Sequence, residues 1–226
     1  MSGGIGPISS PPWTPFNTRL LRLLNATYLW PLGEPNGATR ASEVLGGKHA
    51  ALTTAPTFGE TGVVAAETDT SALFTAASSQ YLTTASLDDP GGYDVTLIAF
   101  LKTSAADLRV FFSANGDNVW LGSQGTAKFT AGGKTAIGAS INDGNWHMVA
   151  GVWVSGGNVT CNVDGVDGTP QTGSAAHGPA NIQGTATIGR HSGGYYWSGW
   201  GTKFIIVRRG MLAPELLSLW QAARQP

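Results

Sequence analysis

The chain has 226 residues, of which 42% are hydrophobic and 12% charged, and its formal net charge is −1 at pH 7. This hydrophobic content is too high for a disordered chain, and a chain of this length can bury roughly 70% of the surface that its unfolded form exposes. The balanced charge gives no electrostatic reason to bind nucleic acid, and no apolar run approaches the ~18 residues that span a membrane. The single cysteine, Cys161, excludes an internal disulfide and a cysteine-based zinc site.

The N-terminal segment differs in composition from the rest of the chain. Residues 1–16 read MSGGIGPISSPPWTPF, which is typical of an extended arm stiffened by proline. No basic patch precedes an apolar stretch, so we expect no secretory signal peptide. We therefore divide the chain into an arm at residues 1–18 and one folded domain at residues 19–226, and we expect the arm to anchor the protein to a larger assembly. The arm residues expected to make this contact are Pro7, Pro11, Pro12, Trp13, Pro15 and Phe16.

Most of the domain alternates with the period of two that is typical of β-strands. The segments 94–102 (DVTLIAFLK) and 146–154 (WHMVAGVWV) are apolar on both faces, which we attribute to a position in the middle of two packed sheets. Turn signals separate the strands, as in an all-β sandwich. Further strands are predicted at Leu108 to Ser113, Val119 to Gly122, Ala127 to Ala131, Val159 to Val163 and Lys203 to Arg209.

Helical patterns are scarce. The segment 214–224 (PELLSLWQAAR) predicts a short C-terminal helix, because proline occupies the first helical position, Glu215 lies in the first turn and the apolar residues recur at helical spacing. The segment 18–25 (TRLLRLLN) could form two helical turns or the start of a strand. We therefore expect an all-β domain with one helix at its end.

Seven short motifs occur in the order found in one known family. They are Tyr28 to Gly37, Ala72 to Phe74 with Ser79 to Leu82, Asp94 to Lys102, Gly144 to Ala150, Val163 to Gly165, Ile188 to Arg190 with Trp197 to Gly199, and Met211 to Leu216. With them the chain resembles a laminin-G-like, concanavalin-A-like jelly-roll domain over about residues 26–222. The resemblance implies a β-sandwich of two antiparallel sheets with a short C-terminal helix and an extended N-terminal arm. It does not fix the function, because this fold occurs in lectins, glycosidases, adhesion modules and virion proteins.

Metal binding is not assigned from the sequence. Phe74 is followed by Thr75 and Ala76, where the family usually has Asp-Gly, so a side chain that often lies near a structural calcium is missing. Aspartates near turns, as in calcium loops, also favour turns for purely local reasons. These aspartates are Asp88, Asp89, Asp94, Asp164 and Asp167. We expect no cofactor and leave a structural calcium open.

Catalytic residues are also not evident. Glucanases of this fold carry two carboxyl groups on one strand in a pattern close to E-x-D-x-E, and only Glu67 to Asp69 begins such a pattern, without the second glutamate. His147 has no neighbouring nucleophile in the sequence, and we expect it to be a hydrogen-bonded structural residue of a sheet face. Cys161 alternates with two valines and is expected to be a small buried apolar residue. We therefore expect a protein that is not an enzyme.

Carbohydrate binding has the clearest candidate residues. Residues 190–197 (RHSGGYYW) form a glycine-containing loop that ends in three aromatic residues, and a tryptophan follows the turn at residues 115–118. Aromatic faces stack on sugars, and arginine and histidine donate hydrogen bonds. We expect Trp197 and Trp200 to be buried, and the alternative for the other rings is that they fill the rim of the sandwich. The candidate glycan contacts are Arg190, His191, Tyr195, Tyr196 and Trp120.

Three classes of function fit these features. The first is a non-enzymatic structural or accessory protein of a phage particle, such as a head decoration, fibre or tail subunit, made in the host cytoplasm and located in the virion. Its arm would contact other virion subunits, the chain would form a homo-oligomer, and the sandwich would bind host glycans. The second is a soluble or surface-displayed lectin or adhesin, and the third, disfavoured by the missing carboxylate pair, is a glycoside hydrolase. We take the first as the working prediction.

Overall fold

The computed structural model describes residues 24–64, 69–88, 94–172 and 182–224. The predicted arm at residues 1–18 and most of the segment 18–25 therefore lie outside the described residues, as does Glu67. In the described part of the chain, no helix is long and apolar enough to cross a membrane.

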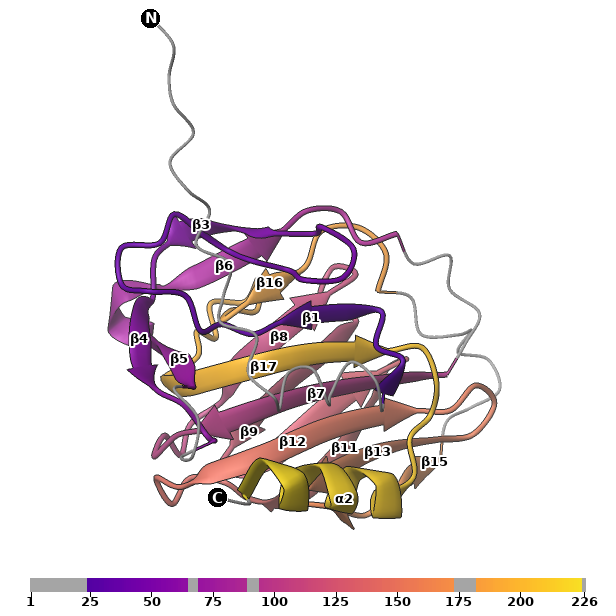
Figure 1. The fold of residues 1–226 in the computed structure, drawn as a ribbon. Coiled ribbons are helices and arrows are strands. Elements are labelled where there is room, and N and C mark those ends of the chain that lie inside the picture. The colour runs from indigo at the N-terminus through magenta and orange to yellow at the C-terminus, as the bar shows by residue number, and fades with distance from the viewer. Residues whose placement is uncertain (1–23, 65–68, 89–93, 173–181, 225–226) are drawn as a thin grey trace, which may run out of the picture.

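Two antiparallel sheets make up the domain, with nine and eight strands among the described residues (Figure 1). Sheet A has nine strands, in the order β14 (Val166–Asp167), β13 (Asn158–Val163), β12 (Trp146–Trp153), β7 (Val95–Lys102), β17 (Gly199–Val207), β5 (Thr70–Phe74) and β4 (Thr57–Thr61), with β1 (Tyr28–Trp30) beside β17 and β15 (Gln171–Thr172) beside β13. Sheet B has eight strands, in the order β11 (Lys134–Ser140), β10 (Thr126–Ala131), β9 (Val119–Gln124), β8 (Arg109–Ala114), β16 (Thr187–Ile188), β6 (Tyr81–Thr84), β3 (Ala50–Thr54) and β2 (Arg40–Ala41). A short 3-10 helix, η1 (Ala76–Ser78), precedes β6, and α2 (Ala213–Arg224) follows β17. The predicted jelly-roll sandwich is confirmed.

The main core lies between the two sheets and is rich in aromatic rings. Phe112 of sheet B stacks on Phe204 of sheet A, with ring centroids 4.4 Å apart. Phe111 packs edge-to-face against Trp197, which is fully buried as the sequence predicted. Adjacent residues Phe111 and Phe112 both point inward because a bulge interrupts the pairing of β8 with β9 at this point. Aromatic rings from both sheets therefore fill the space between the sheets.

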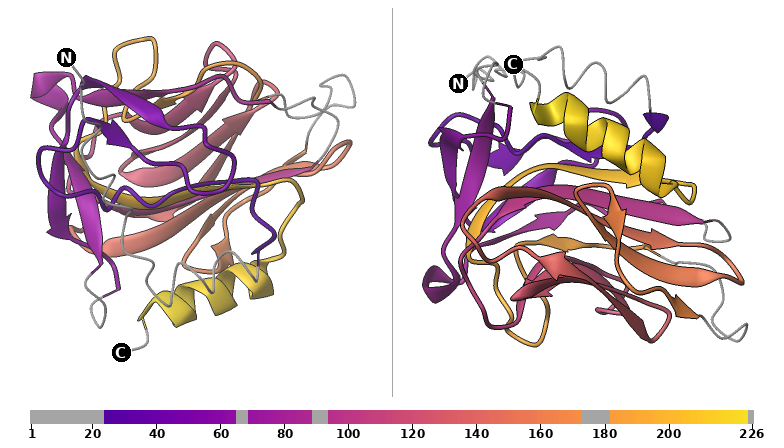
Figure 2. Two further views of the ribbon diagram at one scale, coloured as in Figure 1. Left: turned by 45° about the horizontal axis from the view of Figure 1, so that its top comes forward. Right: turned by 90° about the horizontal axis from the view of Figure 1, so that it is seen from below.

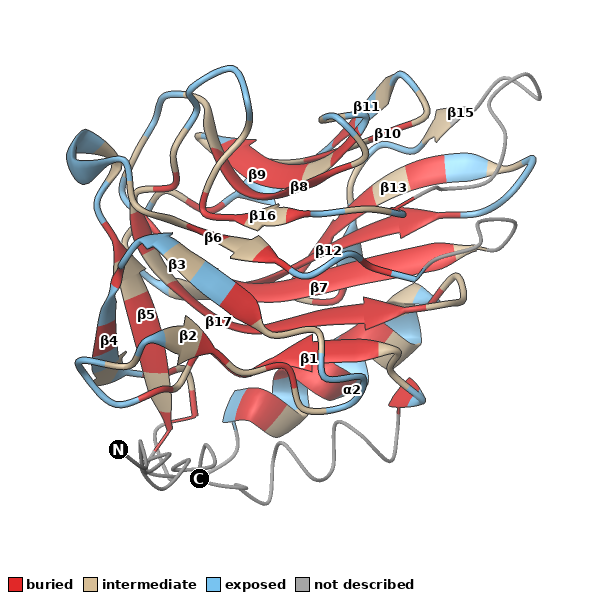
Figure 3. Cartoon of the chain, turned by 90° about the horizontal axis from the view of Figure 1, so that it is seen from above, coloured by how far each residue is buried: buried red, intermediate tan, exposed pale blue. Residues whose placement is uncertain are grey.

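A second apolar cluster covers the outer face of sheet A. Helix α2 lies against this face, so the sandwich has three layers at this side (Figure 2). Phe100 of β7 packs on Trp220 of α2, with centroids 6.3 Å apart. The central strands β7, β12 and β17 are therefore buried on both faces (Figure 3). This corrects the sequence interpretation, in which two sheets alone accounted for both apolar faces; a sheet packs on its partner through one face only, and the helix buries the other.

Several element boundaries differ from the predictions. Strand β17 begins at Gly199 and ends at Val207, so the last predicted strand starts earlier and stops two residues sooner. Strands β3, β4 and β11 were not predicted, because alanine, threonine and glycine dominate them and their apolar alternation is weak. The C-terminal helix was predicted to within one residue.

Candidate functional site

The predicted glycan contacts come together where two connections meet at one side of sheet B. The segment between β16 and β17 folds back beside the β8–β9 turn, and its Tyr196 forms bridges with Val110 and Arg190. We call the resulting cluster the rim site. It consists of Tyr81, Trp120, Arg190, His191, Tyr195 and Tyr196.

The side chains of the rim site form two groups, and the contacts run between members of the same group. Trp120 and His191 stand perpendicular with centroids 6.3 Å apart, and His191 lies 5.6 Å from Tyr195. In the second group, the guanidinium carbon of Arg190 lies 4.6 Å from the centre of the Tyr81 ring, which is a cation–π distance. Tyr81 also lies 6.1 Å from Tyr196.

Tyr81 was missed from the sequence because it lies more than one hundred residues before the loop it contacts. Only the pairing of β6 with β16 brings these segments together.

Asp117 fastens the loop to the sheet. Its carboxylate accepts hydrogen bonds from the hydroxyl of Ser113 on β8 and from the hydroxyl and backbone N–H of Ser192 in the loop. Burial raises the pKa of Asp117, but the hydrogen bonds from Ser113 and Ser192 outweigh that effect and hold the pKa below its usual value. The charged carboxylate therefore ties together two connections that are 75 residues apart in the sequence.

The loop also fixes the orientation of His191. The N–H of Gly194 donates to the His191 carbonyl at 3.0 Å, and the N–H of Gly193 donates to His191 Nδ1 at 3.0 Å. Gly194 adopts a φ of +84°, which favours glycine at this turn. Because Nδ1 accepts a hydrogen bond, a neutral His191 carries its proton on Nε2 and can donate it to a ligand. Tyr195 is the most exposed ring here, at 43%.

Trp200 is not buried, contrary to the sequence prediction. It lies half-buried on β17, with the ammonium of Lys102 4.9 Å from the centre of its ring. The neighbouring Gly201 faces the core, where it contacts the Phe111 ring. Because side chains alternate along a strand, Trp200 points away from the core and stays partly accessible.

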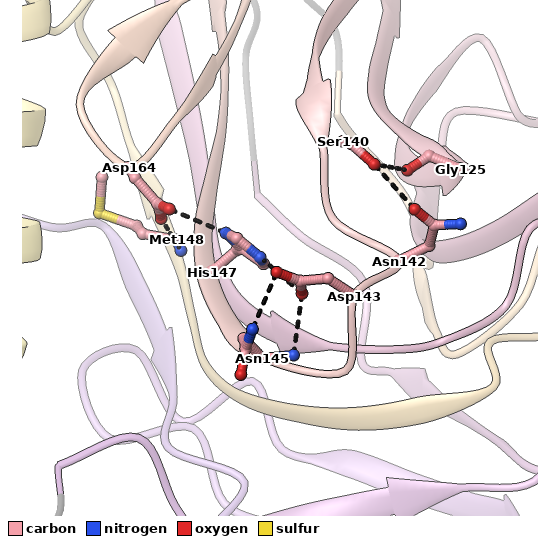
Figure 4. A network of polar contacts seen from close by, with 8 residues as sticks. All are labelled: Gly125, Ser140, Asn142, Asp143, Asn145, His147, Met148 and Asp164. Carbon is pink, nitrogen blue, oxygen red and sulfur yellow. Dashed lines mark hydrogen bonds and ion pairs between the residues drawn. The ribbon is translucent and has the colours of Figure 1, made fainter.

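His147 lies between two carboxylates, those of Asp143 and Asp164 (Figure 4). Its Nδ1 lies 2.8 Å from Asp164 Oδ2 and its Nε2 lies 3.0 Å from Asp143 Oδ1. The Asp164 carboxylate, aided by Asp143 and opposed by burial, raises the pKa of His147. With both ring nitrogens engaged, His147 links the turn before its own strand β12 to the turn after β13, which fits the hydrogen-bonded structural role predicted for it.

The remaining candidate aspartates have protein partners. Asp88 forms an ion pair with Lys48 at 2.6 Å, Asp94 accepts a hydrogen bond from the N–H of Ser155, and Asp167 accepts one from the side chain of Asn162. Asp89 lies outside the described residues. Within the described ranges, no group of three or more histidine, cysteine, aspartate or glutamate residues is placed to hold a metal ion.

Three carboxylates are buried in the described part of the chain, those of Glu34, Glu43 and Asp69. Asp69, from the incomplete motif, forms a buried ion pair with Lys203 of β17. Glu43 is buried and accepts hydrogen bonds from four backbone N–H groups. Burial raises the pKa of Glu34, whose Oε1 accepts a hydrogen bond from the N–H of Ser42 at 2.7 Å. The carboxylate of Glu43, with four backbone donors around it, serves to hold its loop in place.

Solved structures with a similar fold include domain 4 of the arabinanase AbnA from Geobacillus stearothermophilus in complex with arabinotriose. It has 14% identity and a TM-score of 0.60, and the match covers 87% of this chain and 98% of that domain. The botulinum neurotoxin serotype D ligand-binding domain in complex with N-acetylneuraminic acid has 10% identity and a TM-score of 0.61, over 89% of this chain and 52% of that one. The botulinum neurotoxin serotype G binding domain has 13% identity and a TM-score of 0.63, and the match covers 88% of this chain and 51% of that one.

The chain thus spans about half the length of the neurotoxin chains that it matches. At these identities the likeness shows the fold alone. No curated protein matches the chain in a sequence comparison. The family model of the concanavalin A-like lectin/glucanases superfamily matches residues 76–209, which is more than half of the chain. The motifs, the two-sheet sandwich and this match agree, and the chain belongs to the concanavalin A-like lectin/glucanases superfamily.

Proposed function

We propose that this chain is a non-catalytic carbohydrate-binding domain that holds glycans at the rim site. The observation that carries the proposal is the meeting of Trp120, His191 and Tyr195 in one ring cluster, next to which along the chain Arg190 packs on Tyr81. Two of the similar structures were solved with a saccharide, arabinotriose and N-acetylneuraminic acid, which supports this class of ligand.

The chemistry of the rim site suits a sugar. The aromatic faces can stack on the apolar C–H face of a sugar ring, while Arg190 and His191 can donate hydrogen bonds to its hydroxyl or carboxylate oxygens. The Asp117 contacts hold the loop in place before binding, so little conformational entropy is lost when a ligand arrives. A role as a glycosidase is disfavoured because the buried carboxylates of Asp69 and Glu43 serve structural contacts.

A glycan array tests the proposal. We expect the wild-type protein to bind a subset of glycans and the Tyr195→Ala, Tyr196→Ala double variant and Trp120→Ala to lose that binding. Trp200→Ala is the matched control, because Trp200 is also half-buried but lies on sheet A. Thermal unfolding monitored by circular dichroism checks that each variant folds. Array binding that is unchanged in the double variant and in Trp120→Ala would refute the site.

The placement of this domain in a phage particle stays a prediction from the sequence. It rests on the proline-rich composition of residues 1–18, which lie outside the described residues. If the arm contacts other virion subunits, deleting residues 2–16 should abolish incorporation into particles while the domain still folds and binds glycans. Normal incorporation of the deletion variant would instead favour a lectin or adhesin that acts outside a particle.

A further inference from the structure

The outer face of sheet B next to the rim site is accessible. On β10 the inward residue Phe129 is fully buried in the core, whereas its neighbours Lys128 and Thr130 are half-buried on the opposite face. On β11, Ala136 is buried and Thr135 and Ile137 are exposed. No helix among the described residues covers this part of sheet B, unlike the outer face of sheet A.

Trp120 begins a row of side chains that crosses the strands of this face. In the strand register Trp120 of β9 is paired with Thr130 of β10, and Thr130 is paired with Thr135 of β11. Neighbouring strands lie about 4.8 Å apart, so the row extends roughly 10 Å from the tryptophan. That length exceeds what one sugar ring on Trp120 would cover.

The side chains along this row can bind hydroxyl groups. The hydroxyls of Thr130 and Thr135 lie 2.7 Å apart, so one donates to the other. The accepting hydroxyl keeps its own proton, and both oxygens keep an acceptor position for a ligand. Beside them the ammonium of Lys128 donates one hydrogen bond to Gln124 at 2.6 Å, which leaves two further donor protons.

On the β8 side of Trp120 the row does not continue with accessible side chains. The residue paired with Trp120 on β8 is Ser113, which is only 3% exposed. Its hydroxyl donates to Asp117, the same carboxylate that binds Ser192 of the loop. A ligand on Trp120 therefore meets the fastened loop on the β8 side and accessible threonines on the β10 side.

From this arrangement we infer that the ligand is an extended oligosaccharide, longer than a disaccharide, that runs from the rim site across β9, β10 and β11. The inference rests on the proposed function and adds the length and direction of the ligand. One sugar unit stacks at Trp120, and the following units hydrogen-bond to Thr130 and Thr135. Affinity is therefore expected to increase with chain length until the row is filled.

The test measures affinity against length. The probes are linear arabinans, glucans, mannans and α2,8-linked sialic acids, each from the monosaccharide to the hexasaccharide, first on an array and then by calorimetry for the class that binds. The wild-type protein is compared with a Thr130→Val, Thr135→Val double variant. The matched control is Thr53→Val, Thr83→Val, because these two threonines form a similar hydroxyl pair at 3.1 Å on strands β3 and β6 of the same sheet.

We expect affinity to rise from monosaccharide to longer chains, and the Thr130/Thr135 variant to bind the hexasaccharide about tenfold more weakly, with the monosaccharide unaffected. The control variant should bind like the wild type. If the Thr130/Thr135 variant binds every length normally while Trp120→Ala loses binding, this inference is wrong and the proposed function stands. If Trp120→Ala binds normally, this inference is wrong. If the Tyr195→Ala, Tyr196→Ala variant also binds normally, or the wild type binds no probe, the proposed function fails with it.

Discussion

Asp117 offers the sharpest test of how the rim site is built. Two variants separate its contributions: Asp117→Asn keeps the shape and one acceptor oxygen, whereas Asp117→Ala removes both acceptors. A hydrogen bond to a charged group contributes about 1.5–3 kcal/mol. The Asp117 side chain is 14% exposed and lies near the surface, where water can replace part of each hydrogen bond. We therefore assign about 1.5 kcal/mol, the lower end of this range, to each of the hydrogen bonds from the Ser113 and Ser192 hydroxyls.

This sum predicts a loss of about 3 kcal/mol in the free energy of unfolding for Asp117→Ala. Because Asp117 has a φ of +69°, which alanine adopts poorly, roughly 1 kcal/mol is added. Asp117→Asn retains one acceptor and tolerates this backbone conformation, so about half of the loss is expected. Both variants should also weaken glycan binding, because the loop that carries His191 and Tyr195 is no longer fastened.

Urea unfolding followed by tryptophan fluorescence measures the free energy, and amide hydrogen exchange at Ser192 and Gly194 measures opening of the loop. The pH dependence gives an independent check. Because the folded pKa of Asp117 is lowered, its contribution is present above the ordinary pKa of about 4 and is lost as the pH falls through the folded value. Wild-type stability should fall there more steeply than that of Asp117→Asn. Equal stability, exchange and glycan affinity in wild type and Asp117→Ala would refute the reasoning.

Three further predictions concern the scaffold. Gly151→Ala should cost about 1–3 kcal/mol in urea unfolding, because a Cβ at this position would overlap the Phe129 ring, and an unchanged midpoint would contradict the packing. Because the pKa of His147 is raised in the folded protein, its stabilising effect is complete below about pH 6.5 and is lost as the pH rises through the folded pKa. In His147→Gln, the free energy of unfolding should therefore decrease less with rising pH above about 6.5 than in the wild type, and an equal decrease in both would contradict this role. Burial raises the pKa of the Cys161 thiol to about 12, so a thiol reagent should label it only after unfolding, and rapid labelling of the native protein would show that the core opens.

Much of the fold could be predicted from the sequence because it depends on local patterns. The period of two along residues 146–154 specifies a strand, and the proline and glutamate at the start of residues 214–224 specify a helix. The order of the short motifs also indicated the superfamily. Strands such as β11 were missed because alanine, glycine and threonine leave little apolar alternation to detect.

The sequence by itself determined the class of the domain and the residue types able to bind a sugar, since both follow from the order of neighbouring side chains. Only the tertiary structure decided which of them meet. Tyr81 reaches Arg190, and Asp117 reaches Ser192, through contacts between distant segments that no local pattern encodes. The burial of both faces of β7 likewise depends on where α2 packs, because burial is a property of the assembled layers and not of a single strand.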